Sequence, residues 1–167
     1  MNTLRGFFLG GNVIYQFAST IQNWMKQLGC QTVPEVSKIL HNFNELEKDI
    51  DERNNEIPSL KIIPRLYGER HEPTSTASIS GFCAENLSLP NTVNAIYTGL
   101  LENIRDMFPL KLLLEQYGIE GIVGTGGALL RSKLLLKKVT GIFKVPLRTV
   151  EDSDAATGAA MFVADVS

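Results

Sequence analysis

Three stretches of the chain place apolar residues every three or four positions, which is the spacing of one face of a helix. The first runs from Val13 to Leu28, after which Gly29 is suited to end a helix. The second runs from Val36 to Leu46, and the third from Val93 to Phe108. Pro109 must end, kink or restart the third helix, because proline lacks the backbone N–H that a continuing helix uses.

Polar residues mark both ends of the second predicted helix. Thr32 and Glu35 have the spacing of a capping box, and Pro34 between them suits a first helical turn, so the helix is predicted to begin there. The acidic and polar run from Glu45 to Glu56 predicts a solvated helix end followed by a loop.

Two short strands are predicted in the middle of the chain. Leu60 to Ile63 is an apolar run that stops at a proline, which is consistent with a strand. Glycine, proline, serine and threonine cluster from Gly68 to Thr76 and predict a loop. Apolar or small residues then alternate with serine and phenylalanine from Ala77 to Cys83, which indicates a second strand.

The last part of the chain alternates strands with helices. A predicted strand (Ile119 to Val123) runs into a glycine turn (Gly124 to Gly127), and a helix follows from about Leu130. A further strand (Val145 to Val150) precedes a helix of small residues (Ala155 to Val163). This alternation indicates an α/β domain, and a length of 167 residues suits one domain.

The composition is that of an ordinary globular protein, with 44% hydrophobic residues, 20% charged residues and a net charge of −2. No basic field for nucleic acid and no polybasic patch or apolar span for a membrane is visible. A secretory signal is not expected, because Gly10 and Gly11 interrupt the short apolar run after Arg5. Cys30 and Cys83 are too few for a disulfide framework and favour a cytoplasmic location, although one disulfide between them stays open.

The glycine turn Gly124-Thr125-Gly126-Gly127-Ala128 is the main candidate for ligand binding. Glycines let the backbone approach a ligand closely and adopt positive φ. The helix N-terminus beyond the turn adds unpaired N–H groups and the positive end of a dipole, which suits a phosphate. The alternative is a tight strand-to-helix turn without a ligand.

Two known phosphate motifs can be compared with this turn. A Walker loop is excluded, because no Gly-Lys-Ser/Thr follows. A dinucleotide fingerprint needs a third glycine or alanine where Leu129 stands, but Glu151 could serve as its ribose-binding acid. A dinucleotide-binding oxidoreductase domain therefore remains an alternative.

Three separated segments occur in a specific order. The first is Gly68-Glu69-Arg70-His71-Glu72-Pro73, and the second runs from Ala77 to Thr98. The third begins with Gly124-Thr125-Gly126-Gly127 and ends in Ala156-Thr157-Gly158-Ala159-Ala160. Together they resemble the FGGY-type carbohydrate kinases, whose signature matches the second segment except at Phe82, Thr92 and Thr98.

Within this family, the chain resembles the sedoheptulokinase branch. The supporting stretches include Gly10-Gly11-Asn12-Val13, Ala128-Leu129-Leu130-Arg131 and Asp152-Ser153-Asp154-Ala155-Ala156. Many relatives carry a glutamate where this chain has Ser153, between Asp152 and Asp154, so the role of that carboxylate is not carried over.

The resemblance implies an actin-like ATPase (ribonuclease H-like) α/β fold. It assigns residues 1–167 to a single domain, the C-terminal nucleotide-binding domain of a two-domain sugar kinase. The implied reaction is phosphoryl transfer from ATP with Mg to a sugar hydroxyl, with no Mg ligand identifiable in this chain. The sugar-binding domain and the aspartate base are expected to lie outside the chain, which is therefore expected to be inactive by itself.

Family likeness also suggests roles for single residues. Gly126 and Gly127 would lie against the phosphate and ribose of the nucleotide, beside Thr125, and Arg131 would contact the adenine. The alternatives are a turn hydroxyl at Thr125 and a solvated first-turn residue at Arg131. Gly158 and the alanines around it are predicted to allow close helix packing rather than to bind a ligand.

Other chemistry is sparse in the sequence. His41 is predicted to lie on a helix surface or in its packing, and His71 has no second histidine or cysteine at metal-ligand spacing. Glu69 and Arg70 could pair with each other, or Arg70 could brace an interdomain cleft. Beside the kinase part, a non-catalytic nucleotide-binding module from a truncated gene remains a second hypothesis. The expected partners are ATP and ADP, with a sugar only in the complete enzyme, and neither nucleic acid nor a membrane.

Overall fold

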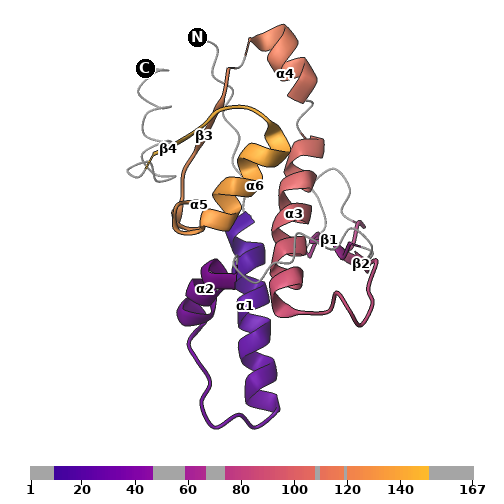
Figure 1. Ribbon diagram of the computed structural model, residues 1–167, viewed down its shortest axis with the longest axis vertical. Coiled ribbons are helices and arrows are strands. Elements are labelled where there is room, and N and C mark those ends of the chain that lie inside the picture. Colours follow the sequence, from indigo (N-terminus) through magenta and orange to yellow (C-terminus); the bar gives the residue numbers. More distant parts are fainter. Residues whose placement is uncertain (1–9, 47–58, 67–73, 108–109, 119, 151–167) are drawn as a thin grey trace. The chain divides into compact units, whose positions relative to one another are not determined.

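The computed structural model describes residues 10–46, 59–66, 74–107, 110–118 and 120–150 (Figure 1). The chain divides into two compact units. The N-terminal unit is Leu4–Pro109, and the C-terminal unit combines Leu110–Ser167 with Met1–Thr3.

Two helices begin the N-terminal unit, α1 (Gly10–Gln27) and α2 (Val36–Glu45). They pack against each other, and the rings of Phe17 and Phe43 lie 5.8 Å apart between their centroids. Phe43 is fully buried. Both predicted helices are confirmed, although α1 begins three residues before Val13.

The end of α1 confirms the predicted stop at Gly29. This glycine has a φ of 73°, and its N–H donates to the carbonyl of Lys26 at 3.1 Å. The N–H of Cys30 reaches back to the carbonyl of Met25, also at 3.1 Å. These two bonds form a Schellman cap, which satisfies the last carbonyls of the helix and favours glycine at the left-handed position.

The start of α2 differs from the prediction. Its N-cap is Glu35, which is extended and makes no side-chain capping bond, so the capping box that begins at Thr32 is wrong. Pro34 precedes the helix, and its carbonyl accepts a hydrogen bond from the Gln22 amide of α1 at 2.9 Å. This contact ties the approaching chain to α1, and the helix then begins only at Val36.

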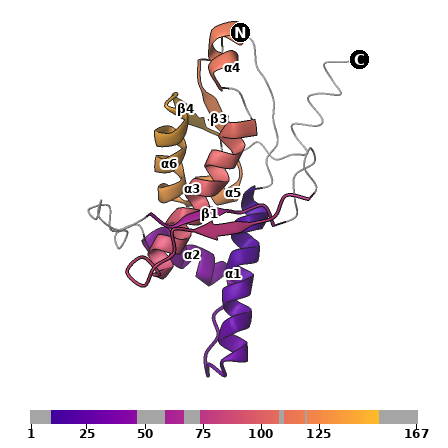
Figure 2. The same ribbon diagram turned by 90° about the vertical axis from the view of Figure 1, so that its right-hand side faces the viewer.

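A two-stranded antiparallel sheet and a long helix complete the N-terminal unit. The strands are β1 (Lys61–Ile63) and β2 (Ser78–Ser80), and the helix is α3 (Leu89–Met107). Ile62 pairs with Ile79, and β1 packs against α3 (Figure 2). Both predicted strands are confirmed, and β2 is shorter than expected because the chain turns at Gly81, where φ is 69°.

The buried side chain of Asn86 organises the loop between β2 and α3. Its Oδ1 accepts from the N–H of Cys83 at 3.0 Å, and its Nδ2 donates to the carbonyl of Gly81 at 2.6 Å. The carbonyl of Asn86 in turn accepts from the Asn91 amide at 3.2 Å. One side chain thus supplies partners for backbone groups that a loop leaves unpaired.

Replacing Asn86 by alanine should therefore destabilise the protein. Asn86→Ala leaves the N–H of Cys83 and the carbonyl of Gly81 without these partners, and the expected loss in free energy of unfolding is about 2 kcal/mol. Urea denaturation followed by circular dichroism measures it. Asn42→Ala, at an exposed position of α2, is the control and should change stability little. Equal stability of the two variants would contradict this role of the Asn86 side chain.

The C-terminal unit alternates helices and strands. It contains α4 (Leu110–Tyr117), β3 (Ile122–Gly124), α5 (Gly127–Arg131), α6 (Lys133–Phe143) and β4 (Leu147–Thr149). β3 and β4 are parallel, with Ile122 opposite Leu147. Parallel neighbours need a crossover between them, and α5 with α6 provides it. The predicted α/β organisation is confirmed here. One helix ends at Met107 and the next begins at Leu110, so of the alternatives predicted at Pro109 the helix restarts.

The predicted helix from about Leu130 is wrong in its start and in its continuity. The helix begins at Gly127 and ends at Arg131, and a second helix begins at Lys133. Between them, Ser132 is extended, and its buried hydroxyl accepts from the N–H of Leu135 at 3.2 Å. A serine N-cap of this kind stabilises the start of α6 and interrupts the run.

Several predictions fall outside the described residues. They concern most of the loop from Gly68 to Thr76, most of the polar run after Glu45 and the small-residue helix from Ala155 to Val163. Within the described ranges, no helix is long and apolar enough to cross a membrane.

Candidate functional site

The glycine turn connects β3 to α5. Its first glycine, Gly124, is the last residue of β3, and it is buried. A β-carbon there would collide with the side chain of Leu129 and come within 3.2 Å of Leu147 Cδ1. A larger residue at Gly124 would therefore require these two leucine side chains to shift.

Gly126 has a backbone conformation that side chains rarely adopt. Its φ is 98° and its ψ is 147°, a region essentially restricted to glycine. A β-carbon at this residue would meet no atom within 4 Å. Glycine adopts these angles without strain, whereas a side chain would not, and the open space beside it leaves room for a ligand to approach.

Gly127 begins α5 and differs from Gly126. Its φ lies outside the left-handed range, and a β-carbon there would meet only the guanidinium of Arg131, at 3.8 Å. That is an ordinary van der Waals contact. The fold itself does not demand glycine at this position, so another cause for the glycine has to be sought.

The structure brings the four predicted site residues together within one turn of chain. Thr125, Gly126, Gly127 and Arg131 are all exposed. Arg131 is the last residue of α5, and its guanidinium lies over Gly127 at the first. A cationic planar group therefore stands next to open glycine backbone, which suits an anionic ligand or the face of a base.

The contribution of the helix dipole is smaller than predicted. The first hydrogen bond of α5 joins the N–H of Leu130 to the carbonyl of Gly126 at 3.0 Å. The preceding N–H groups have no acceptor inside the helix, as at every helix start. However, α5 has only five residues, so few peptide dipoles add up. The open glycine backbone and Arg131 are the stronger arguments for a ligand.

Leu129 bears on the dinucleotide alternative. Its side chain lies against Gly124 and fills the space between strand and helix. In a dinucleotide fingerprint, a third glycine there lets the helix pack close to the strand. Here the glycine that allows the helix to pack close to the strand is Gly124, which lies on the strand itself. Glu151, the proposed ribose acid, lies outside the described residues.

The other candidate residues do not gather at this turn. His41 is exposed on α2, which agrees with the surface alternative rather than the packing one, and Cys30 and Cys83 are free cysteines. Among the residues that the structure describes, no group of three or more histidine, cysteine or acidic side chains could hold a metal ion. His71, Glu69 and Arg70 lie outside those residues.

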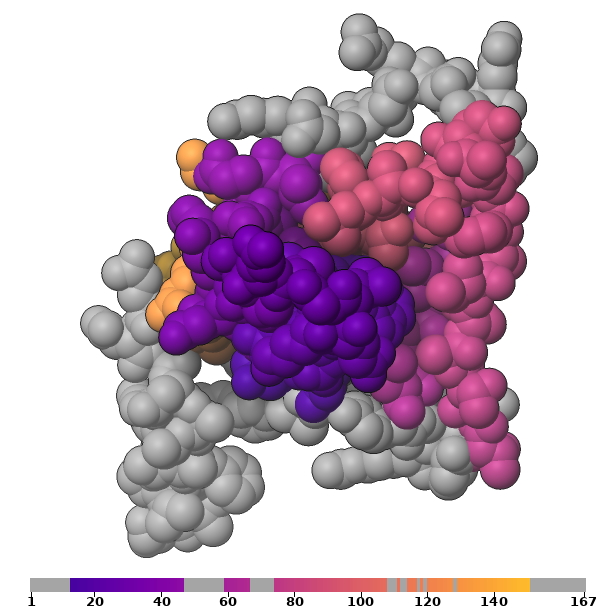
Figure 3. All heavy atoms as spheres, turned by 90° about the horizontal axis from the view of Figure 1, so that it is seen from below, coloured from indigo at the N-terminus to yellow at the C-terminus, as the bar shows by residue number. Residues whose placement is uncertain are grey.

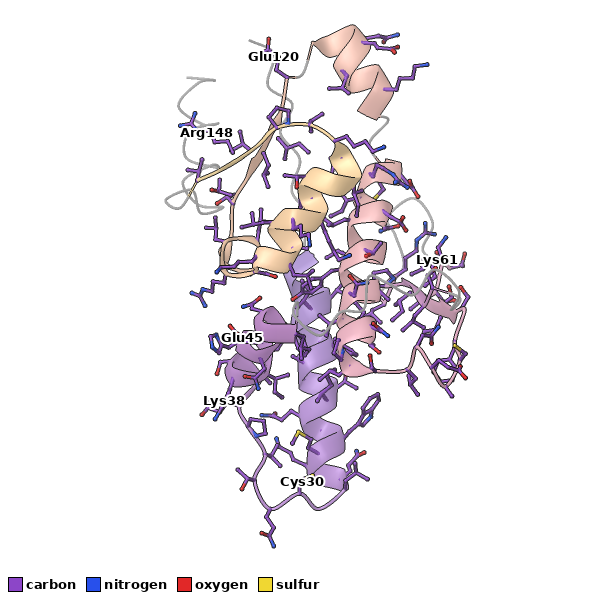
Figure 4. The ribbon with its side chains drawn as sticks, viewed as in Figure 1. Cys30, Lys38, Glu45, Lys61, Glu120 and Arg148 are labelled. Atoms are coloured by element: carbon purple, nitrogen blue, oxygen red, sulfur yellow. The ribbon has the colours of Figure 1, made fainter. Side chains whose placement is uncertain are left out.

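Two residues near the turn, Ser132 and Arg148, were not singled out by their sequence pattern. Ser132 could have been found, because a serine directly before the apolar run of α6 is an N-cap signal. Arg148 is exposed on β4, next to β3, and pairs with Val123 in the sheet (Figure 4). Only the parallel pairing of the two strands places this arginine on the strand beside the one that leads into the turn.

Comparison with known proteins relates this geometry to one family. No protein-family model matches the chain. Sedoheptulokinases from Homo sapiens and Mus musculus are each 32% identical to it over 152 residues, which is 91% of this chain. The chain spans about 30% of the length of these relatives.

Solved structures show the same fold. A xylulose kinase from Rhodospirillum rubrum matches 80% of this chain and 26% of its own, with a TM-score of 0.58 and 13% identity. A xyloylose kinase from Brucella ovis, as that protein is named, matches 81% of this chain and 26% of its own, with a TM-score of 0.54 and 24% identity. The expected actin-like α/β fold is thereby confirmed. In sequence the chain is similar to sedoheptulokinases over 91% of its length, and in fold it is similar to sugar kinases.

Proposed function

We propose that this chain is the nucleotide-binding part of an ATP-dependent sugar kinase of the sedoheptulokinase type. The observation that carries the proposal is 32% identity to sedoheptulokinases across 91% of the chain. The matched stretch is long enough to include most of both units. The assignment of the chain to the C-terminal domain of such an enzyme, and a cytoplasmic location, are parts of the same proposal.

The glycine turn fits the phosphates and ribose of ATP. Open space faces Gly126, and at Gly127 only the movable end of the Arg131 side chain stands near a potential β-carbon. Backbone N–H groups at the start of α5 are free of intrahelical acceptors and can donate to phosphate oxygens. Thr125, which is exposed beside these groups, is part of the same proposed site.

Arg131 is the residue proposed to contact the adenine. A guanidinium is planar and stacks on aromatic faces, and it is also always charged. Its place beside Gly127 supports this role if the phosphates lie at the turn. Because this side chain is exposed, water replaces part of its contact when it is removed.

The proposed reaction is in-line transfer of the γ-phosphoryl group of ATP to a sugar hydroxyl. Such transfer depends mainly on positioning and on neutralising charge. When bound, Mg would neutralise the phosphates, but the described residues hold no ligand cluster for it. The residues of this chain would hold and orient the nucleotide. The base for the sugar hydroxyl, and the sugar pocket, are assigned to the remainder of such an enzyme.

The proposed acceptor of the complete enzyme is a seven-carbon ketose. The support for this acceptor is the name of the relatives, sedoheptulokinase. The candidate site residues are proposed to bind the nucleotide, so they give no information on the sugar. If a complete enzyme containing this sequence preferred glycerol or xylulose by kcat/KM, the acceptor would be wrong while the nucleotide site could stand.

The chain by itself should bind ATP and should not phosphorylate sugars. Without a positioned acceptor and base, little rate enhancement beyond solution chemistry remains. Calorimetric titration with ATP should give a saturable signal, and NAD should give none under the same conditions. A coupled assay for ADP with sedoheptulose, xylulose, gluconate and glycerol should show no sugar-dependent turnover.

Each arm of this experiment has an outcome that contradicts the proposal. Preferential binding of NAD would favour a dinucleotide domain over a kinase part. Clear release of ADP that depends on a sugar would show that the chain carries the whole catalytic machinery. Absence of ATP binding would contradict the proposal that the glycine turn is a nucleotide site.

A further inference from the structure

The charges of the protein are unevenly distributed along the chain. The net charge is −2, yet every charged residue between Gly121 and Val150 is a cation. The acidic residues at positions 151, 152 and 154 follow, and the stretch from 121 to 154 still carries a net positive charge. We call the cations before them the cationic segment; they are Arg131, Lys133, Lys137, Lys138, Lys144 and Arg148.

The side chains of the cationic segment lie at the surface. All of them are exposed except Lys138, which is half-buried. Atoms of this part of the chain are visible in orange at the surface in Figure 3. Within the described ranges, no acidic side chain forms an ion pair with Arg131, Lys133 or Arg148. Their positive charges therefore act on the surrounding solvent and on charged ligands that approach through it.

The fold does not explain the cation at Lys133. This lysine is the first residue of α6, where the positive end of the helix dipole disfavours a positive side chain. Lys137 lies four residues further along the same helix, and like charges at that spacing repel each other. The first turn of α6 has no acidic residue to offset these effects. Because the charge does not help the helix, a role outside the fold has to be sought.

The first cations of the segment directly adjoin the glycine turn. Arg131 ends α5 and lies over Gly127, and Lys133 begins the next helix after Ser132, which belongs to the caps of both. α5 has five residues, so at a rise of about 1.5 Å per residue it is roughly 8 Å long. The Debye length is about 8 Å at physiological ionic strength and about 30 Å at 0.01 M. The field of Lys133 therefore reaches the turn, and it does so more strongly at low salt.

We propose that the cationic segment speeds the binding of ATP by attracting its phosphates to the glycine turn, with Lys133 acting through its field and not through contact. This inference rests on the proposed nucleotide site and adds a role for residues that do not touch the nucleotide. Charges beside a binding site raise the association rate constant more than they strengthen the final contacts. Nucleic acid is another polyanion that cations attract. The open space at Gly126, next to these cations, favours a small ligand instead.

Stopped-flow mixing of the intact chain with fluorescently labelled ATP measures the association and dissociation rate constants. At an ionic strength of about 0.01 M, Lys133→Gln should lower the association rate constant about two- to threefold, and Lys133→Glu about fivefold or more. The dissociation rate constant should stay nearly unchanged, and Lys133→Arg, which keeps the charge, should behave as the unaltered chain does. At about 1 M salt, where the Debye length is about 3 Å, the differences should vanish. Labelled ADP, which carries less negative charge than ATP, should show smaller effects.

Lys111→Gln and Lys111→Glu are the matched controls. Lys111 is exposed in the same unit, but it lies on α4, outside the cationic segment. These variants change the net charge by the same amounts and should slow association much less than the Lys133 variants do. Circular dichroism confirms that each variant is folded.

The outcomes separate this inference from the nucleotide site itself. If ATP binds but Lys133→Glu leaves the association rate constant unchanged at low salt, or if the Lys111 variants slow association equally, the inference is wrong and the nucleotide site stands. A loss that persists at about 1 M salt, or that comes from faster dissociation, would indicate direct contact and overturn it too. If the unaltered chain binds no ATP, both fail together. Tighter binding of a single-stranded oligonucleotide than of ATP, abolished by Lys133→Glu, would assign the cations to nucleic acid instead.

Discussion

Gly127→Val should lower the affinity for ATP by at least about tenfold, or ~1.4 kcal/mol, while leaving the melting temperature nearly unchanged. A β-carbon at this position meets only the end of the Arg131 side chain within the protein, at ordinary contact distance. The backbone is not in the left-handed region, so a branched side chain adds little strain. In the proposed complex, however, the added methyl groups occupy space that the phosphates and ribose need. Titration with ATP and thermal unfolding of the same sample measure both quantities.

Gly126→Ala and Arg131→Ala are the companions of this variant. Because Gly126 has a φ of 98°, alanine there should cost about 1–3 kcal/mol of stability. Arg131→Ala should reduce ATP affinity less than Gly127→Val does, because water replaces part of an exposed contact. If Gly127→Val changed neither affinity nor stability, the turn would be a structural connection without a ligand.

Gly99→Ala should destabilise the N-terminal unit by about 3 kcal/mol, although alanine normally stabilises a helix relative to glycine. Gly99 is buried in the middle of α3, where the helix packs against β1. A β-carbon would collide with the carbonyl oxygen of Ile62 and come within 3.2 Å of Pro64 Cδ. The strand backbone cannot move aside as a flexible side chain could, so the helix and the strand must separate. Urea denaturation monitored by circular dichroism measures the loss.

Gly141→Ala provides the control with the opposite sign. This glycine lies in α6, is exposed, and has nothing within 4 Å of its potential β-carbon. The same substitution should therefore raise stability by up to about 1 kcal/mol. Similar effects at the two glycines would contradict the close contact between α3 and β1.

Hydrophobic periodicity predicted most of the described elements, because it reports directly which face of a helix or strand is buried. The stripes beginning at Val13, Val36 and Val93 all lie in helices, and Gly29 ends the first of them. The errors concern the residues at which two of the helices begin. Nothing in the spacing of Thr32 and Glu35 shows that a tertiary bond from Gln22 to Pro34 holds the preceding chain to α1.

The position of the glycine turn could be predicted from the sequence but its geometry could not, and its role as a ligand site stays a prediction. Family likeness located the turn and Arg131, and the structure places the guanidinium of that residue over Gly127. The sequence treated the glycines of the turn alike, yet each has a different cause. Gly124 lies against the side chains of Leu129 and Leu147, Gly126 has backbone angles that only glycine adopts easily, and Gly127 is not required by the fold. These distinctions depend on φ and on neighbours distant in sequence, which a motif does not encode.

The junction at Ser132 has a consequence for motion. A single residue separates α5 from α6, and that residue belongs to the caps of both helices. Its N–H bonds to the carbonyl of Leu129 at 3.2 Å, and its carbonyl accepts from the N–H of Leu136 at 3.1 Å. A hinge needs residues whose dihedral angles can change without breaking such bonds. We therefore expect α5 to move together with α6 rather than to bend away from it at Ser132.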